Sequence, residues 1–183
     1  MDMQPTISDA RFLEVFNVLE RVIEEKYGIP VRIKDVPSPF TGDLDGAEIH
    51  VDYEEDPEGA LFILVHLFGH TVQWNLNPRA MEIGLAVFNL EPTDENLAEL
   101  KTYEVQACQY SMQLMHDAHI HDLDQWLSDF AACDFAYLRA FYLTRTKKPF
   151  RSFWKAKQPL IAPLAIPDFH PKELTSRWKG VVI

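Results

Sequence analysis

The sequence predicts an α+β fold that is mostly helical and carries a small antiparallel sheet. Long segments with apolar residues three and four positions apart indicate helices, and two short segments that alternate apolar and polar residues indicate strands. The strands are separated by a turn-rich stretch, residues 41–46, as in an antiparallel pair. A chain of 183 residues, 47% of them hydrophobic, is long enough to bury one core.

The first predicted elements are a helix and the two strands. Ser8 is a suitable N-cap for the helix, and Gly28 is a suitable stop just after Tyr27. The alternating segments at residues 31–34 and 47–52 then read as half-buried strands. Helix and strands together predict a small α+β unit at the start of the chain.

Three further helical patterns follow the strands. Asp56 followed by Pro57 is a good N-cap and first-turn pair, and opens a helix that runs to about residue 75. Residues 79–92 predict an irregular connection with room for a short helix or strand. Two more helices are predicted over about residues 93–115 and 122–144.

Charge is distributed unevenly along the chain. Residues 1–144 hold 8 Lys or Arg and 26 Asp or Glu, a net charge of −18, whereas residues 145–183 hold 9 and 2, a net charge of +7. We expect residues 146–183 to form a basic tail that packs on the domain made by residues 1–145. The alternative is a tail that contacts nucleic acid, because its cations alternate with aromatic rings. These residues are Lys147, Lys148, Phe150, Arg151, Phe153, Trp154, Lys155 and Lys157.

The composition argues against a membrane or secreted protein. The longest strongly apolar stretch, residues 60–65, is far shorter than the roughly 20 residues that a membrane span needs. The N-terminus has Asp2 and Asp9 and no apolar core typical of a signal peptide. Cys108 and Cys133 both lie in apolar helical patterns, where a small buried thiol is expected rather than a disulfide. We therefore expect a soluble, cytoplasmic protein.

Two histidines in the predicted helix at 56–75 have the spacing of metal ligands. His66 and His70, in the sequence HLFGH, are four positions apart and share one helical face. Glu104 interrupts an otherwise apolar or small stripe of the helix at 93–115, and a buried carboxylate needs a partner. Two imidazoles and one carboxylate are the ligand set of a catalytic zinc site. The alternative is a hydrogen-bonded cluster of buried side chains without a metal.

Other polar residues near these positions have two readings. Gln73 lies on the metal face of its helix and either hydrogen-bonds a ligand or meets solvent at the helix end. His116, His119 and His121 form a second histidine cluster, for which a second metal site is one interpretation. The other is that these histidines follow the end of a helix, where histidines commonly face the helix dipole and solvent. For both, the solvent-facing reading is favoured.

The sequence resembles the ImmA/IrrE family of zincin-like metallopeptidases, which are bacterial and phage proteins. The order and spacing of four elements carry the resemblance, which covers roughly residues 10–115. The resemblance implies a zincin-like fold for residues 1–145. The matching stretches are KYGIPVRI at 26–33, GAEIHVD at 46–52, FILVHLFGH at 62–70 and YEVQACQY at 103–110.

The resemblance also implies roles for single residues. His66 and His70 correspond to the two zinc-binding histidines, and Glu104 corresponds to the glutamate ligand that precedes a small residue, here Ala107. The resemblance further implies that the strand around residues 48–52 is an edge along which a peptide extends. Zinc is therefore the expected metal, and a peptide or protein is the expected partner.

The sequence departs from the family at Leu67. The family has a glutamate there that polarises the metal-bound water, and a leucine side chain has no group that accepts a proton. General-base assistance is worth typically ~10²–10⁴ in rate, so its loss predicts weak peptidase activity. Another carboxylate is a possible replacement, and the candidates by sequence are Asp43, Asp45, Glu48 and Glu99.

These observations leave three functional hypotheses. The favoured one is a zincin-like metal-binding protein, catalytically impaired, that acts as a peptide- or protein-binding regulator. The second is an active zinc-dependent peptidase or other hydrolase with a displaced general base. The third is a nucleic-acid-associated factor that acts through the basic tail, against which the acidic body argues.

Overall fold

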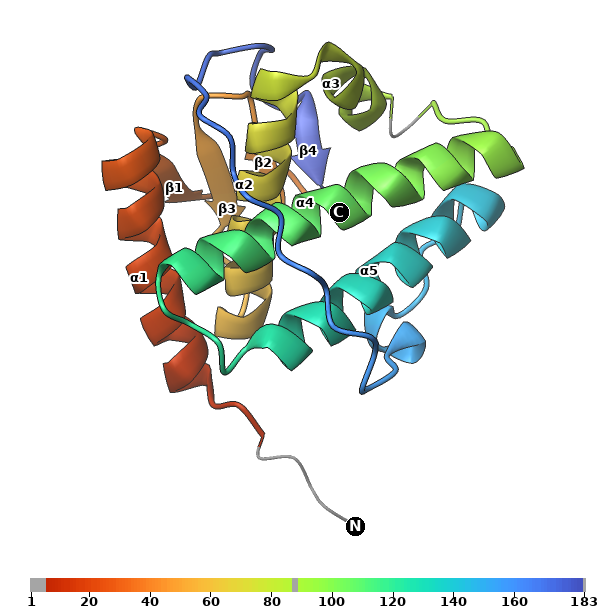
Figure 1. Ribbon diagram of the computed structural model, residues 1–183. Helices are drawn as coiled ribbons and strands as arrows, with labels where there is room; N and C mark the ends of the chain where they lie inside the picture. Colours follow the sequence, from red (N-terminus) through yellow and green to blue (C-terminus); the bar gives the residue numbers. More distant parts are fainter. Residues whose placement is uncertain (1–5, 87–88, 183) are drawn as a thin grey trace.

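The structure, a computed structural model, describes residues 6–86 and 89–182. Helices make up most of the regular structure, and the predicted α+β class is confirmed (Figure 1). The elements in chain order are α1 (Asp9–Tyr27), β1 (Val31–Lys34), β2 (Gly42–Leu44), β3 (Ile49–Asp52), α2 (Pro57–Leu76), α3 (Pro78–Leu85), α4 (Asp94–Asp117), α5 (Asp124–Thr144), the 3-10 helix η1 (Phe150–Phe153) and β4 (Gly180–Val182).

The sheet is mixed, so the prediction of an antiparallel sheet was wrong. Its strand order is β1-β3-β2-β4, with β1 and β3 parallel and the other two pairs antiparallel. The reason is that residues 42–44, in the stretch predicted as a turn, form β2. A tight turn at Gly46, where φ is 99°, then returns the chain as β3, which inserts between β2 and β1. The strand at 49–52 is therefore internal and not the edge that the resemblance implied.

Helix α2 is the centre of the molecule. It contacts α1, α4 and the sheet, and all of its residues from Leu61 to Trp74 are buried. The helix begins as predicted, because the Asp56 side chain accepts a hydrogen bond of 2.7 Å from the Gly59 N–H. An apolar helix enclosed on all sides provides a rigid support for the polar groups that it carries.

The segment 79–92, predicted as an irregular connection, contains most of α3, which Asn77 caps by accepting from the Arg79 N–H. Residues 87 and 88 of this segment lie outside the described residues. Among the helices that are described, none is long and apolar enough to cross a membrane.

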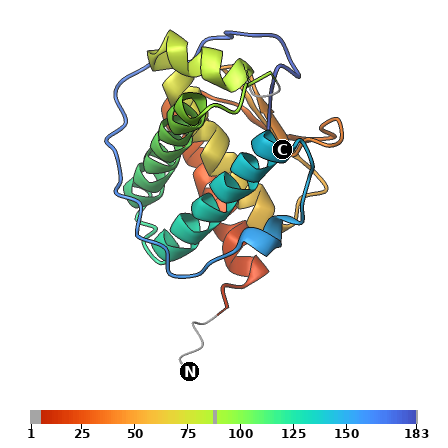
Figure 2. The ribbon, with the colours of Figure 1, turned by 90° about the vertical axis from the view of Figure 1, so that its right-hand side faces the viewer.

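The basic tail runs across the surface of the helices before its last residues join the sheet (Figure 1, Figure 2). Phe150 packs on Phe130 of α5 at 5.1 Å between ring centroids. Arg151 pairs with Glu58, and its guanidinium lies 4.7 Å above the Trp154 ring. Further along, the Leu164 N–H donates to the carbonyl of Gln109 on α4. Phe150 and Arg151 therefore both contact the acidic body.

Candidate metal centre

His66 and His70 of α2 and Glu104 of α4 meet in the interior, as the sequence predicts. The two Nε2 atoms are 3.0 Å apart, and Glu104 Oε2 lies 3.1 Å from His66 Nε2 and 3.3 Å from His70 Nε2. All three residues are buried. Their ligand atoms are close enough together to hold one metal ion.

The close approach of α2 and α4 depends on small residues. A Cβ at Gly69 would lie 2.2 Å from the Ala107 carbonyl oxygen, so that only glycine fits where the helices touch. One turn further along α4, the Ser111 hydroxyl donates a hydrogen bond of 2.7 Å to the Val65 carbonyl. The small residues at 69 and 107 thus bring Glu104 within reach of the histidines.

Gln73 fixes the orientation of His70. Its side-chain N–H₂ donates to the Tyr103 carbonyl at 2.9 Å and to Gln106 Oε1 at 2.8 Å, which leaves its oxygen to accept from His70 Nδ1 at 2.9 Å. The Tyr103 ring stacks on the imidazole, with centroids 4.3 Å apart. In a metal-bound form His70 would carry its proton on Nδ1, which would leave the lone pair of Nε2 for the metal. Gln73 is buried, so the favoured reading of a solvent-facing glutamine was wrong.

The donor set fits a metal ion. Glu104 Oε2 is buried and has no hydrogen-bond partner among the described residues, although it touches both imidazoles. Zinc–nitrogen and zinc–oxygen bonds of about 2.0–2.2 Å place tetrahedral ligand atoms about 3.3 Å apart, close to the observed separations. Burial alone would raise the pKa of Glu104, but the adjacent His70 and His66 hold this pKa below its usual value, which keeps the carboxylate ionised for binding.

Leu67 lies in the contact between α2 and the sheet. Its side chain is fully buried, and a Cβ added to Gly42 of β2 would lie 2.8 Å from Leu67 Cδ1. A carboxylate at position 67 would therefore be buried against β2. The leucine completes the core here and offers no proton acceptor.

A small inner pocket of about 40 Å³ borders the candidate ligands His66 and Glu104. This volume suits a water molecule or an ion. The other wall residues come from α2, α5 and β4: they are Phe62, Ile63, Asp134, Leu138, Tyr142, Val181 and Val182.

Asp134 of α5 is the carboxylate of this pocket. No hydrogen bond or ion pair joins it to another described side chain, and it is not one of the three residues whose ligand atoms cluster. Burial raises the pKa of Asp134 to about 7, His66 opposes this shift, and Glu104 adds to it. Asp134 therefore faces the metal centre from across the pocket, as a group that can take up or release a proton near neutral pH.

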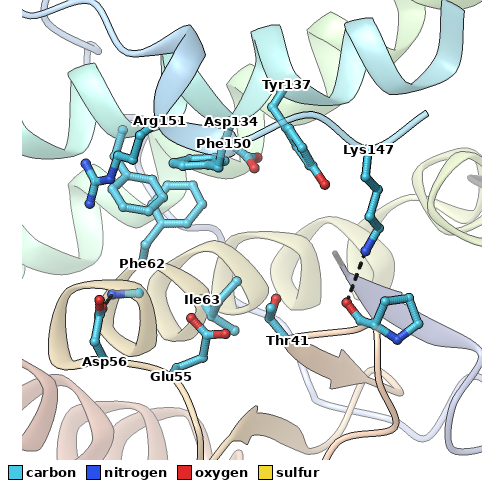
Figure 3. Close-up of a pocket in the computed structure, with 13 residues that line it drawn as sticks. Thr41, Glu55, Asp56, Phe62, Ile63, Asp134, Tyr137, Lys147, Phe150 and Arg151 are labelled. Atoms are coloured by element: carbon cyan, nitrogen blue, oxygen red, sulfur yellow. Dashed lines mark hydrogen bonds between the residues drawn. The ribbon is translucent and has the colours of Figure 1, made fainter. Parts of the chain in front are cut away.

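A larger outer cavity of about 390 Å³ adjoins the inner pocket, and the two share Phe62, Ile63 and Asp134 (Figure 3). Asp134 and Tyr137 project into this cavity from α5, opposite the first turns of α2. Its rim includes the cations of Lys147 and Arg151 and the carboxylates of Glu55 and Asp56. The outer cavity gives a ligand with both apolar and charged groups a place next to the metal centre.

None of the four carboxylates considered from the sequence as a replacement base lines the inner pocket. Asp43 and Asp45 both pair with Arg177 of the tail. Glu48 contacts His50, and Glu99 forms an exposed ion pair with Arg79. Asp134 was missed, although a signal was present. It interrupts the apolar stripe Phe130–Leu138 of its helix, just as Glu104 does in α4.

The second histidine cluster lies near the surface at the C-terminal end of α4, with His116 in the last turn of the helix. His116, His121 and Asp124 are close enough together to hold an ion, whereas His119 is not part of this group. His116 Nε2 already lies 3.0 Å from the Asp124 carboxylate, and His121 is exposed. The contact of His116 with Asp124 and the exposure of His121 to solvent explain the cluster without a metal.

Comparisons with family models, with curated proteins and with solved structures found no match. The resemblance to the ImmA/IrrE family thus stays a prediction. The geometry of the candidate metal centre is what supports a function for this chain.

Proposed function

We propose that this protein is a zincin-like metal-binding protein that binds zinc through His66, His70 and Glu104 and acts by binding a peptide or protein. The observation that carries the proposal is the meeting of two imidazole nitrogens and an unpartnered buried carboxylate oxygen within 3.3 Å. Without a cation, the charge of Glu104 is buried with no full compensation, and that is a costly arrangement.

Zinc fits this donor set better than the harder divalent ions. Imidazole suits zinc, and magnesium and calcium prefer oxygen ligands alone. Three protein ligands would leave one position for water or for a group of the partner, to which bound zinc supplies Lewis acidity. The chain's own contribution is orientation: Gln73 holds His70, and the contact of α2 with α4 positions Glu104.

The position of Leu67 supports a binding role over general proteolysis. Its side chain is committed to the core against Gly42, so the residue next to the first histidine takes no part in proton transfer. We therefore expect little activity on generic peptides.

Asp134 favours a second candidate function, a metal-dependent hydrolase with a displaced base. Its carboxylate shares the inner pocket with His66 and Glu104 and opens to the outer cavity, where a substrate has room. A carboxylate in this place can take a proton from a water that attacks a substrate held in the outer cavity.

The first experiment measures zinc in protein purified without chelators or a metal-affinity tag. We expect about one zinc per chain, because three ligands of suitable type meet at one point. The variants His70→Ala and Glu104→Ala should lose it. His121→Ala is the matched control, since it removes a histidine of the surface cluster, and it should leave the zinc content unchanged. A zinc-free protein whose stability ignores added zinc would contradict the proposal.

The two candidate functions are separated by zinc-loaded protein with Asp134 or with Asp134→Asn. Cleavage of a fluorogenic peptide mixture by the unmodified protein, lost in Asp134→Asn at equal zinc content, would establish the hydrolase. The binding role predicts no cleavage by either form and equal zinc content in both.

A further inference from the structure

The last strand of the chain covers the inner pocket from the side of the sheet. Strand β4 pairs antiparallel with β2, with Val181 opposite Asp43 and Val182 opposite Gly42. The Val182 carbonyl also accepts a hydrogen bond of 2.9 Å from the Thr41 N–H. Val181 and Val182 both line the pocket that contains His66 and Glu104. Strand β4 is therefore the outermost strand at this edge of the sheet, and two of its three residues form part of the wall of the inner pocket.

Arg177, three positions before β4, anchors this part of the chain next to β2. The Arg177 guanidinium donates to Asp43 Oδ2 at 2.8 Å and also pairs with Asp45. Asp43 is fully buried, so the loss of Arg177 would leave a buried carboxylate without its cation. Arg177 is thus a firm anchor, whereas the three residues of β4 add only edge-strand hydrogen bonds.

Trp178, between this anchor and β4, has a strained backbone. Its φ is 62°, a left-handed conformation that is uncommon for a bulky residue, and its side chain is partly exposed. Such strain persists only where surrounding contacts enforce it. Here the contacts are the hydrogen bond of 3.3 Å from the Trp178 N–H to Asp43 Oδ2, the contact of the Trp178 ring with His50 and the pairing of β4. Release of β4 would therefore remove one of the constraints that maintain this strain.

The edge of β2 restricts which residues a strand paired with it can have. A Cβ at Gly180 would lie 2.1 Å from the Leu44 carbonyl oxygen, so the residue paired with Leu44 must be glycine. The next residue, Val181, is buried, and Val182 is partly buried. The edge therefore accepts an extended segment in which glycine precedes two aliphatic residues.

We propose that β4 is a built-in occupant of a peptide-binding edge and that an extended segment of a partner protein, glycine followed by aliphatic β-branched residues, replaces it on β2. The partner segment pairs antiparallel with β2 while Arg177 stays anchored and Trp178 acts as the hinge. This inference rests on the proposed function in one respect, that His66, His70 and Glu104 hold a metal ion. Release of β4 opens the inner pocket from the side of the sheet, and its return closes this side. A second cavity of about 230 Å³, between α4, α5 and the tail, also reaches His66 and Glu104 and has no residue of β4 in its lining.

The test uses the chain ended after Lys179 and a fluorescein-labelled peptide copied from residues 179–183. Fluorescence anisotropy should show saturable binding of this peptide to the shortened chain. The full chain should bind it at least about tenfold more weakly, because its tethered strand competes at an effective concentration on the order of millimolar. A peptide with alanine in place of its glycine is the matched control and should not bind. The measurement is made on zinc-free protein as well as on zinc-loaded protein.

A second readout is the rate at which a chromogenic chelator removes zinc. It should be faster for the shortened chain, and also for the full-length variant Gly180→Ala, whose Cβ has no room beside Leu44. A folded shortened chain that ignores the peptide, or that binds the alanine peptide equally well, would overturn the inference. Absence of zinc from all forms would contradict the proposed function alone, since the peptide measurement does not require the metal.

Discussion

Gln73 shows how a residue outside the ligand set controls a candidate ligand. It accepts from His70 Nδ1, and its own two hydrogen bonds to α4 fix which end of the amide faces the imidazole. We expect Gln73→Ala to weaken zinc binding by about 10–100-fold, because the ring loses the acceptor that sets its tautomer and orientation.

Titration against a competing chelator measures this effect. Gln73→Glu keeps an acceptor for Nδ1 and should bind more tightly than Gln73→Ala. Gln113→Ala, which removes a partly exposed glutamine of α4 hydrogen-bonded to Asp117, should match the unmodified protein. Equal affinities for all four proteins would show that His70 needs no orienting partner.

Asp134 should make the stability of the zinc-free protein depend on pH. Folding raises the pKa of Asp134 from its ordinary value of 3.8 to about 7, because the carboxyl group is buried. The folded state therefore retains a proton that the unfolded chain releases, so that the stability falls as the pH rises from about 4 to about 7 and then levels off. Asp134→Asn removes this dependence and should gain at most about 4 kcal/mol relative to the unmodified protein above pH 7.

Urea unfolding of both zinc-free proteins between pH 4 and pH 8 provides the measurement. The gap between the two curves should widen with rising pH. A gap that stays constant over this range would show that Asp134 is ionised throughout.

At the scale of elements, the sequence predicted helices α1, α2, α4 and α5 and strands β1 and β3, but not helix α3 or strands β2 and β4. Ser8, Asp56 and Thr93 cap α1, α2 and α4 through their own side chains, and such signals lie within a few residues of the helix that they start. Strand β2 has three residues in a glycine-rich stretch, and β4 has three residues far along the chain. The pairing of β4 depends on β2, a partner distant in sequence, and segments as short as β2 and β4 carry no periodicity that reveals them.

The difference between local and long-range sequence signals also explains which parts of the candidate site were predicted. The histidines of α2 were found because their spacing is local, and Glu104 because it breaks an apolar stripe. The role of Gln73 and the place of Asp134 depend on how α2, α4 and α5 pack, which a single helical pattern does not contain.

The tail should contribute substantially to stability. Ending the chain after Thr146 removes the packing of Phe150 and Trp154 on Phe130 and the partner of Glu58. We expect a loss of about 3 kcal/mol or more in the free energy of unfolding, because aromatic surface of the body becomes exposed. Urea unfolding compares this chain with one ended after Lys179, which keeps those contacts. Equal stability of the two would mean that residues 147–179 add little to the fold.

At the scale of the whole molecule, basic side chains of the tail form ion pairs with acidic side chains of the body. Arg151 pairs with Glu58, and Arg177 pairs with Asp43 and Asp45. We expect only weak DNA binding, lost at physiological salt, because the net charge of −11 repels phosphate and part of the tail's charge is already paired. Fluorescence anisotropy with labelled duplex DNA over a range of salt concentrations tests this. Tight, salt-resistant binding would instead favour the nucleic-acid hypothesis.

The contact of Gly69 with the backbone of Ala107 also bears on how the protein folds. The two histidines become neighbours as soon as α2 forms, whereas Glu104 joins them only when α4 docks on α2 across a separation of more than thirty residues. The pair of histidines alone is a weak chelator, and the full set requires the docked helices. Acceleration of refolding by zinc would therefore report whether this docking precedes the rate-limiting barrier or follows it.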